Sequence, residues 1–82
     1  MPVQRGSRDI PRALRGDWRK LAEAMRDENW TFELGGRHVK AWAPDGVGRA
    51  TLPTTPSDQA AFRNARAAFR RWCREAGITP PI

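Results

Sequence analysis

The residues best suited to chemistry form a cationic trio around the single histidine of this 82-residue chain. His38 directly follows Arg37 and precedes Lys40 by two positions. Cleavage of RNA without a metal ion needs a base for the 2′-hydroxyl group and positive charge for the transition state. An imidazole can accept a proton near neutral pH, so His38 is a candidate general base with Arg37 and Lys40 as its cationic neighbours. The alternative is a histidine that only faces solvent.

These residues lie in a region that the sequence predicts to be a three-stranded meander. Residues 30–34 alternate between apolar and polar side chains, which is typical of a half-buried strand. Gly35-Gly36 predicts a turn and residues 37–42 a second strand. Pro44-Asp45-Gly46 predicts another turn, and residues 48–52 a third strand.

The alternation of the second strand predicts where its side chains point. If Val39 and Ala41 face a core, then His38, Lys40 and Trp42 share the opposite, open face of the sheet. On that face, the Trp42 ring could stack on an unpaired base. The alternative is a ring packed in the core or at its rim, where tryptophan is more often found.

The sequence predicts one helix on each side of these strands. In the first, Asp17 is the expected cap, and the end is expected near Glu28 or Asn29. Its apolar stripe consists of Trp18, Leu21, Ala22 and Met25. The second helix is expected to open over residues 54–58, to run to Ala76 and to stop at Gly77. Its apolar face consists of Phe62, Ala65, Phe69, Trp72, Cys73 and Ala76.

The resulting prediction is an α+β fold in the order α-β-β-β-α, with two helices on one face of a three-stranded antiparallel sheet. Residues 1–16 are expected to be a basic, flexible extension, residues 17–78 the domain, and residues 79–82 a tail. The expected core between the helices and the sheet consists of Trp18, Met25, Phe32, Phe62, Phe69 and Trp72.

The formal charge of +6 is concentrated at the two ends of the chain. On the second helix, arginines follow spacings of three and four residues and predict a continuous cationic stripe. The stripe consists of Arg63, Arg66, Arg70 and Arg74, with Arg71 beside it. Such a stripe can follow a phosphate backbone, so we expect RNA contact there. The alternative is a solvated helix face, in a chain that is rich in arginine because a GC-rich genome encodes it.

The remaining composition excludes several classes of protein. One cysteine, Cys73, cannot form an internal disulfide, and one cysteine with one histidine is too few for a zinc site. We therefore expect no metal and no cofactor, and Cys73 is most simply a small buried side chain. No apolar run approaches the length of a membrane span, and no signal-peptide pattern opens the chain. These features predict a reduced, soluble, cytoplasmic protein.

Five short motifs together resemble the HicA toxin family. They are Asn29-Trp30, Gly36-Arg37-His38, Pro44-Asp45-Gly46, Leu52-Pro53 and Glu75-Ala76-Gly77-Ile78. The resemblance covers about residues 17–78. It extends to the HicA-like proteins of actinobacterial phages, whose last helix often opens on a sequence like residues 55–58.

The resemblance implies a small ribonuclease with a double-stranded-RNA-binding-domain-like fold, a HicB-like antitoxin as partner, and His38 as the catalytic histidine. Arg37 replaces the small hydroxyl residue that usually precedes this histidine. Together with the basic extension, it favours binding over cleavage, or an RNA geometry unlike that of the toxins. The sequence and the resemblance thus predict an RNA-binding, HicA-like protein of a bacterial host cell, with metal-independent endoribonuclease activity of a toxin as a candidate function. The alternatives are a non-catalytic nucleic-acid-binding protein and a small phage protein that binds and inhibits a host protein.

Overall fold

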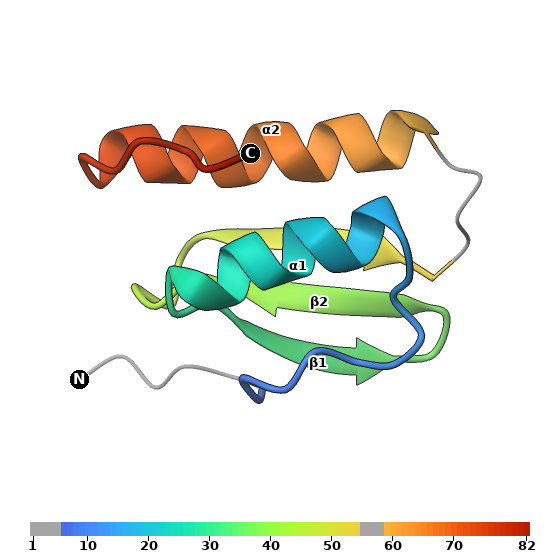
Figure 1. Ribbon diagram of the computed structural model, residues 1–82. Coiled ribbons are helices and arrows are strands. Elements are labelled where there is room, and N and C mark those ends of the chain that lie inside the picture. The colour runs from blue at the N-terminus through green and yellow to red at the C-terminus, as the bar shows by residue number, and fades with distance from the viewer. Residues whose placement is uncertain (1–5, 55–58) are drawn as a thin grey trace.

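The computed structural model describes residues 6–54 and 59–82 and has the predicted α+β fold. The strands pair antiparallel in the order β1-β2-β3, and both helices lie against one face of the sheet (Figure 1). The expected helix opening at residues 55–58 lies outside the described residues. The elements, in chain order, are α1 (Asp17–Asp27), β1 (Thr31–Gly35), β2 (His38–Trp42), β3 (Arg49–Pro53) and α2 (Gln59–Glu75).

The core between the helices and the sheet is built around two large aromatic side chains. Trp30 and Phe69 are both fully buried and meet edge to face, with ring centroids 5.6 Å apart. The predicted core is correct for Trp18, Met25, Phe32 and Phe69, which are buried. Phe62 and Trp72 are only half-buried, because they lie at the two sides of the face that α2 turns toward the sheet. Ala76 follows the last helical residue and is exposed, so its placement on the apolar face was wrong.

Both helices end close to a residue with a positive φ, and α1 does not begin as predicted. Asp17 is the first residue of α1 and not its cap; Gly16 occupies the cap position and makes no side-chain hydrogen bond. At the other end, Asn29 has a φ of 66°, and the Trp30 N–H donates to the Met25 carbonyl at 3.0 Å. After α2, Gly77 has a φ of 75°, so its predicted role as the helix stop is confirmed.

Strand β1 departs from the predicted alternation. Trp30 and Phe32 are buried as expected, but Thr31 between them is buried as well, and Leu34 is 58% exposed. Ser7, in the chain ahead of α1, pairs with β1 at Phe32. Leu34 lies at the other end of β1, next to the exposed Gly35-Gly36 turn.

Residues 6–16, which the sequence analysis placed in the extension, are attached to the domain at two points. Ser7 pairs with Phe32 in an antiparallel bridge, with N–H to carbonyl distances of 2.8 and 2.7 Å. Leu14 is 1% exposed and belongs to the hydrophobic core. The packed part of the molecule therefore begins well before α1.

Candidate nucleic-acid interface

His38 is the first residue of β2, the central strand of the sheet. It stands opposite Gly35 of β1 and Pro53 of β3. Val39 and Ala41 are fully buried, whereas His38 and Lys40 are exposed. The strand period therefore places His38 and Lys40 on the open face, about 7 Å apart along the strand, as predicted. Trp42 follows on the same face and is half-buried at its rim.

The backbone beside His38 is fixed more firmly than its side chain. The backbone N–H and the hydroxyl group of Thr54 both donate to the Arg37 carbonyl, at 3.2 and 2.9 Å. These bonds join the start of β2 to the end of β3. The imidazole itself makes no hydrogen bond or ion pair to any residue in the described ranges. His38 is thus exposed, and no carboxylate of the described residues orients it.

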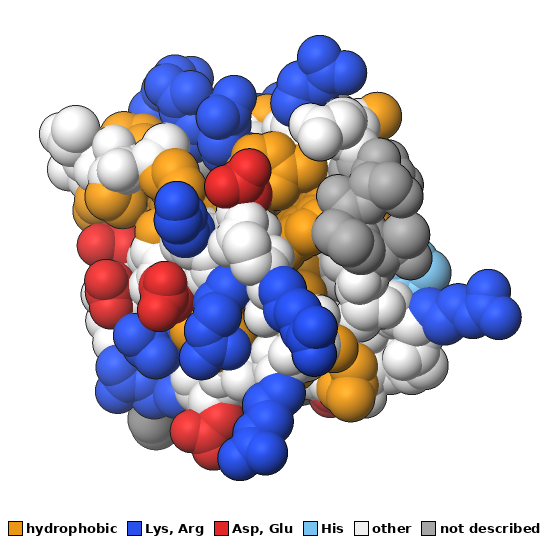
Figure 2. All heavy atoms as spheres, turned by 45° about the vertical axis from the view of Figure 1, so that its right-hand side comes forward, with side chains coloured by type: hydrophobic (Ala, Val, Ile, Leu, Met, Phe, Trp, Pro, Cys, Tyr) orange, Lys and Arg blue, Asp and Glu red, His pale blue; other side chains and the backbone are white. Residues whose placement is uncertain are grey.

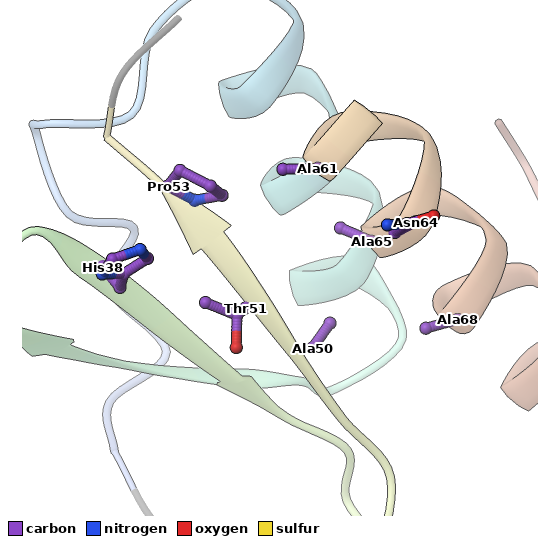
Figure 3. Close-up of a pocket in the computed structure, with 8 residues that line it drawn as sticks. All are labelled: His38, Ala50, Thr51, Pro53, Ala61, Asn64, Ala65 and Ala68. Carbon is purple, nitrogen blue, oxygen red and sulfur yellow. The ribbon is translucent and has the colours of Figure 1, made fainter. Parts of the chain in front are cut away.

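A groove of about 380 Å³ begins at His38 and runs between β3 and α2 (Figure 3). Thr51 and Pro53 form its strand side together with His38, and small side chains of α2 form the opposite wall. The residues on that wall are Ala61, Asn64, Ala65 and Ala68. This wall was not predicted from the sequence, because small residues on a helix have no reactive or charged group that would indicate a site. Alanines recur at positions 61, 65 and 68, on one side of the helix. This pattern could have indicated that the helix packs closely there or leaves a hollow.

Lys40 lines a different hollow, on the open face of the sheet. This hollow also measures about 380 Å³, and Trp42 and Arg49 contribute to it. It shares Ala50 and Thr51 with the groove beside α2, so the two hollows follow the same strand, β3. His38 and Lys40 therefore share a face but line separate hollows. Arg49, which the sequence analysis did not select, adds a second cation beside Lys40.

The predicted arginine stripe forms a continuous surface on α2, here called the arginine surface. It surrounds a shallow hollow of about 220 Å³, and positive charge gathers over α2 at the top of Figure 2. The surface consists of Arg63, Arg66, Arg70, Arg71 and Arg74. Among the described residues, no carboxylate lies within 4.0 Å of these guanidinium groups; the one ion pair found there joins Arg26 and Asp27. The surface therefore presents nearly pure positive charge.

The arginine surface and the groove lie on opposite flanks of α2. Successive residues of an α-helix are about 100° apart, so Arg66 and Arg70 lie on one side of Phe69, and Asn64 and Ala68 on the other. The groove and the arginine hollow share no lining residue. The structure thus brings the arginines together with one another but not with His38.

Asp45 joins the β2–β3 turn to α2 on the flank that carries the groove. Its carboxylate accepts hydrogen bonds from the backbone N–H groups of Val47 and Gly48, at 2.8 and 2.9 Å, and from Trp72 Nε1 at 2.9 Å. The bonds from Gly48, Val47 and Trp72 hold the pKa of Asp45 below its ordinary value of 3.8. The predicted turn is therefore also an anchor for the helix. Gly48 allows this close approach, because a Cβ atom there would lie 2.8 Å from the Trp72 ring.

Other chemistry-bearing groups do not form a further site. Cys73 is fully buried, and burial, followed by the nearby charge of Glu28, raises the pKa of its thiol. In the described part of the chain, no three histidine, cysteine or acidic residues are close enough together to hold a metal ion. Neither described helix is long and apolar enough to cross a membrane.

The chain matches no family model, no curated protein and no solved structure. The resemblance to the HicA toxins therefore remains a prediction from the motifs of the sequence.

Proposed function

We propose that this protein is a HicA-like RNA-binding protein that contacts the phosphate backbone through the arginine surface of α2. The observation that carries the proposal is the run of five arginines on one helix, with no described carboxylate within ion-pairing distance. Unneutralised cations in a row release the counterions of a nucleic acid when they bind its phosphates, and this release drives association. The α-β-β-β-α order, with both helices on one face, agrees with the fold of double-stranded-RNA-binding domains.

The test is the salt dependence of binding to an RNA oligonucleotide. Affinity should fall steeply with salt, and replacing Arg66 and Arg70 with glutamine should flatten the log–log slope by about one to two units, if both contact phosphates. The matched control replaces Arg15 and Arg19, which are exposed outside this surface, and removes the same net charge. An equal change in the control would remove the arginine surface from the interface. Absence of RNA binding at low salt would overturn the proposal.

The position of His38 favours a second candidate function, the cleavage of the bound RNA. The imidazole is exposed at the mouth of the groove and shares the open face with Lys40. As a general base, it would take the proton of a ribose 2′-hydroxyl, whose oxygen attacks the adjacent phosphorus. The 5′-oxygen then leaves, and a 2′,3′-cyclic phosphate remains.

Cleavage should proceed in the presence of a chelator and stop when the scissile linkage lacks its 2′-hydroxyl. His38→Ala should lower the rate by about 10²–10⁴-fold, the usual contribution of a positioned base, without weakening RNA binding. Lys40→Ala should reduce both, because its charge acts on the bound RNA and on the transition state alike. If wild type and His38→Ala arrest bacterial growth equally, the nuclease function is wrong, and binding to RNA or to a host protein is left as the explanation of the growth arrest.

A further inference from the structure

The two outer edges of the sheet differ in how their backbone groups are used. The Ala43 N–H donates to the Gly48 carbonyl at 2.7 Å, which fixes the alternation of the β2–β3 ladder. By this alternation, the N–H and C=O groups of Arg49 and Thr51 point away from β2. No hydrogen bond joins these groups to another described residue. On β1, the corresponding groups of Phe32 are both paired with Ser7. The β1 edge is thus paired at Phe32, whereas the outward groups of β3 have no partner among the described residues.

The open edge of β3 lies within a hollow. The groove beside α2 is lined from the open face of the sheet by His38 and Thr51, and from the covered face by Ala50 and Ala65. Because its lining comes from both faces, the groove wraps around the edge of the strand. The hollow at Lys40 continues it along the open face. Space is therefore present on both sides of a strand that could be added next to β3.

We propose that the edge of β3 is a docking site for an extended segment of an acidic partner protein, which adds a fourth strand to the sheet. The free N–H and C=O groups of Arg49 and Thr51 would supply the main-chain hydrogen bonds. Successive side chains of the added strand point to opposite faces of the sheet. One set enters the alanine-lined groove beside α2, and the other faces Lys40 and Arg49. This proposal does not rest on RNA binding.

The charge of the two hollows decides the chemistry of the occupant. Among the residues that the structure describes, no carboxylate lines either hollow. Glu33, the one acidic residue on this face of the described strands, lies on β1, on the far side of β2 from the open edge. Small apolar residues fit the alanine wall, and acidic residues complement Lys40 and Arg49. The favoured segment therefore alternates small apolar and acidic residues. A second copy of this chain is disfavoured, because each copy carries a net charge of +6.

The proposal can be tested with an acetylated, amidated octapeptide of alternating glutamate and valine, titrated into isotopically labelled protein. The amide signals of Arg49 and Thr51 should shift, and their hydrogen exchange should slow, because both N–H groups become hydrogen-bonded. Ala68→Phe should fill the groove and weaken binding by at least about 10-fold. Ala67→Phe is the matched control, because Ala67 lies on the same helix beside the arginine surface; this variant should bind the peptide like the wild type.

Several results would overturn the proposal. An octapeptide of alternating lysine and valine should bind at least about 10-fold more weakly; equal binding would show that charge plays no part. If signal changes occur only at the arginine surface, the peptide binds there by nonspecific electrostatic attraction and not at the edge of β3. Equal loss in the Ala68→Phe and Ala67→Phe proteins would remove the groove from the interface. Protection of Thr51 that appears with protein concentration alone would assign the edge to a second copy. Equal protection by an RNA oligonucleotide would assign it to RNA.

Discussion

The two flanks of α2 use the same helix in opposite ways. One flank carries the arginine surface, where long charged side chains surround a shallow hollow. The other carries Ala61, Asn64 and Ala68, which are too short to fill the space between the helix and β3. The first flank would act through its own side chains. The second would act through the groove that it leaves beside His38 and the edge of β3.

Each flank is also held to the domain by a different contact. On the arginine side, Phe62 meets Trp18 of α1 edge to face, with ring centroids 5.1 Å apart. On the groove side, Trp72 donates to Asp45 of the β2–β3 turn. Phe69 lies between them and is fully buried. Phe69 therefore supports both flanks, whereas the Phe62–Trp18 and Trp72–Asp45 contacts should each support one.

The largest effect is expected from Phe69→Ala, which should remove the common support. Deleting a buried phenylalanine side chain costs about 3–5 kcal/mol of unfolding free energy, a large part of the stability of a domain this small. Urea denaturation would measure the loss, and RNA binding and peptide binding should fall together. A protein that melts cooperatively with little loss of stability would show that the assigned core face of α2 is wrong.

Asp45→Ala should cost less and should affect the groove side first. It removes an acceptor of three hydrogen bonds at an exposed site, for which we expect a loss of about 1–2 kcal/mol. Asp45→Asn keeps an oxygen that can accept the hydrogen bonds of the turn, but it replaces the charged oxygen that accepts from Trp72. The stability of this variant should therefore lie between those of the alanine variant and the wild type. Thermal unfolding measures the series. If Trp72→Phe has no effect on stability, the contact between the turn and α2 contributes nothing.

The same contact should make stability depend on acid pH. Because the folded protein holds the pKa of Asp45 below 3.8, the stabilisation is complete above that value and is lost as the pH falls through the lowered pKa. The stability difference between wild type and Asp45→Asn should therefore shrink below about pH 4. Denaturation curves recorded from pH 6 down to pH 2 give the comparison. A constant difference over this range would mean that Asp45 titrates alike in the folded and unfolded chain.

The smallest effect is expected within the arginine surface itself. Arg66 lies over the Phe62 ring, 5.8 Å from its centroid, and Arg66→Gln should lower stability by about 0.5–1 kcal/mol through the lost cation–π contact. Arg63→Gln, on the exposed side of the surface, should change stability by less than about 0.5 kcal/mol. Both variants should weaken RNA binding. If the two variants differ in RNA affinity but have the same stability, the contact of Arg66 with Phe62 does not explain the difference between them.

The comparison of the two flanks also separates what could be predicted from what could not. The arginine stripe was predicted correctly, because spacings of three and four residues fix neighbours on one helix face. Strand β2 was predicted correctly for the same kind of reason, since a period of two fixes which residues share a face. The groove was missed, because its two walls come from segments that the sequence separates. Thr31 and Leu34 were assigned wrongly, because a period of two along one strand does not show which other segments pack against it.

The sequence by itself determined the order of helices and strands, the stop at Gly77, the burial of Val39 and Ala41, and the continuity of the arginines. These features depend on backbone periodicity and on the conformational freedom of single residues, and both are local. Only the tertiary structure decided that Ser7 pairs with Phe32 at one sheet edge while the outward groups of β3 meet no described partner. It also decided that Asp45 reaches Trp72 and that α2 separates His38 from the arginines. These features depend on which distant surfaces pack together, and that is set by the volume and shape of the whole core.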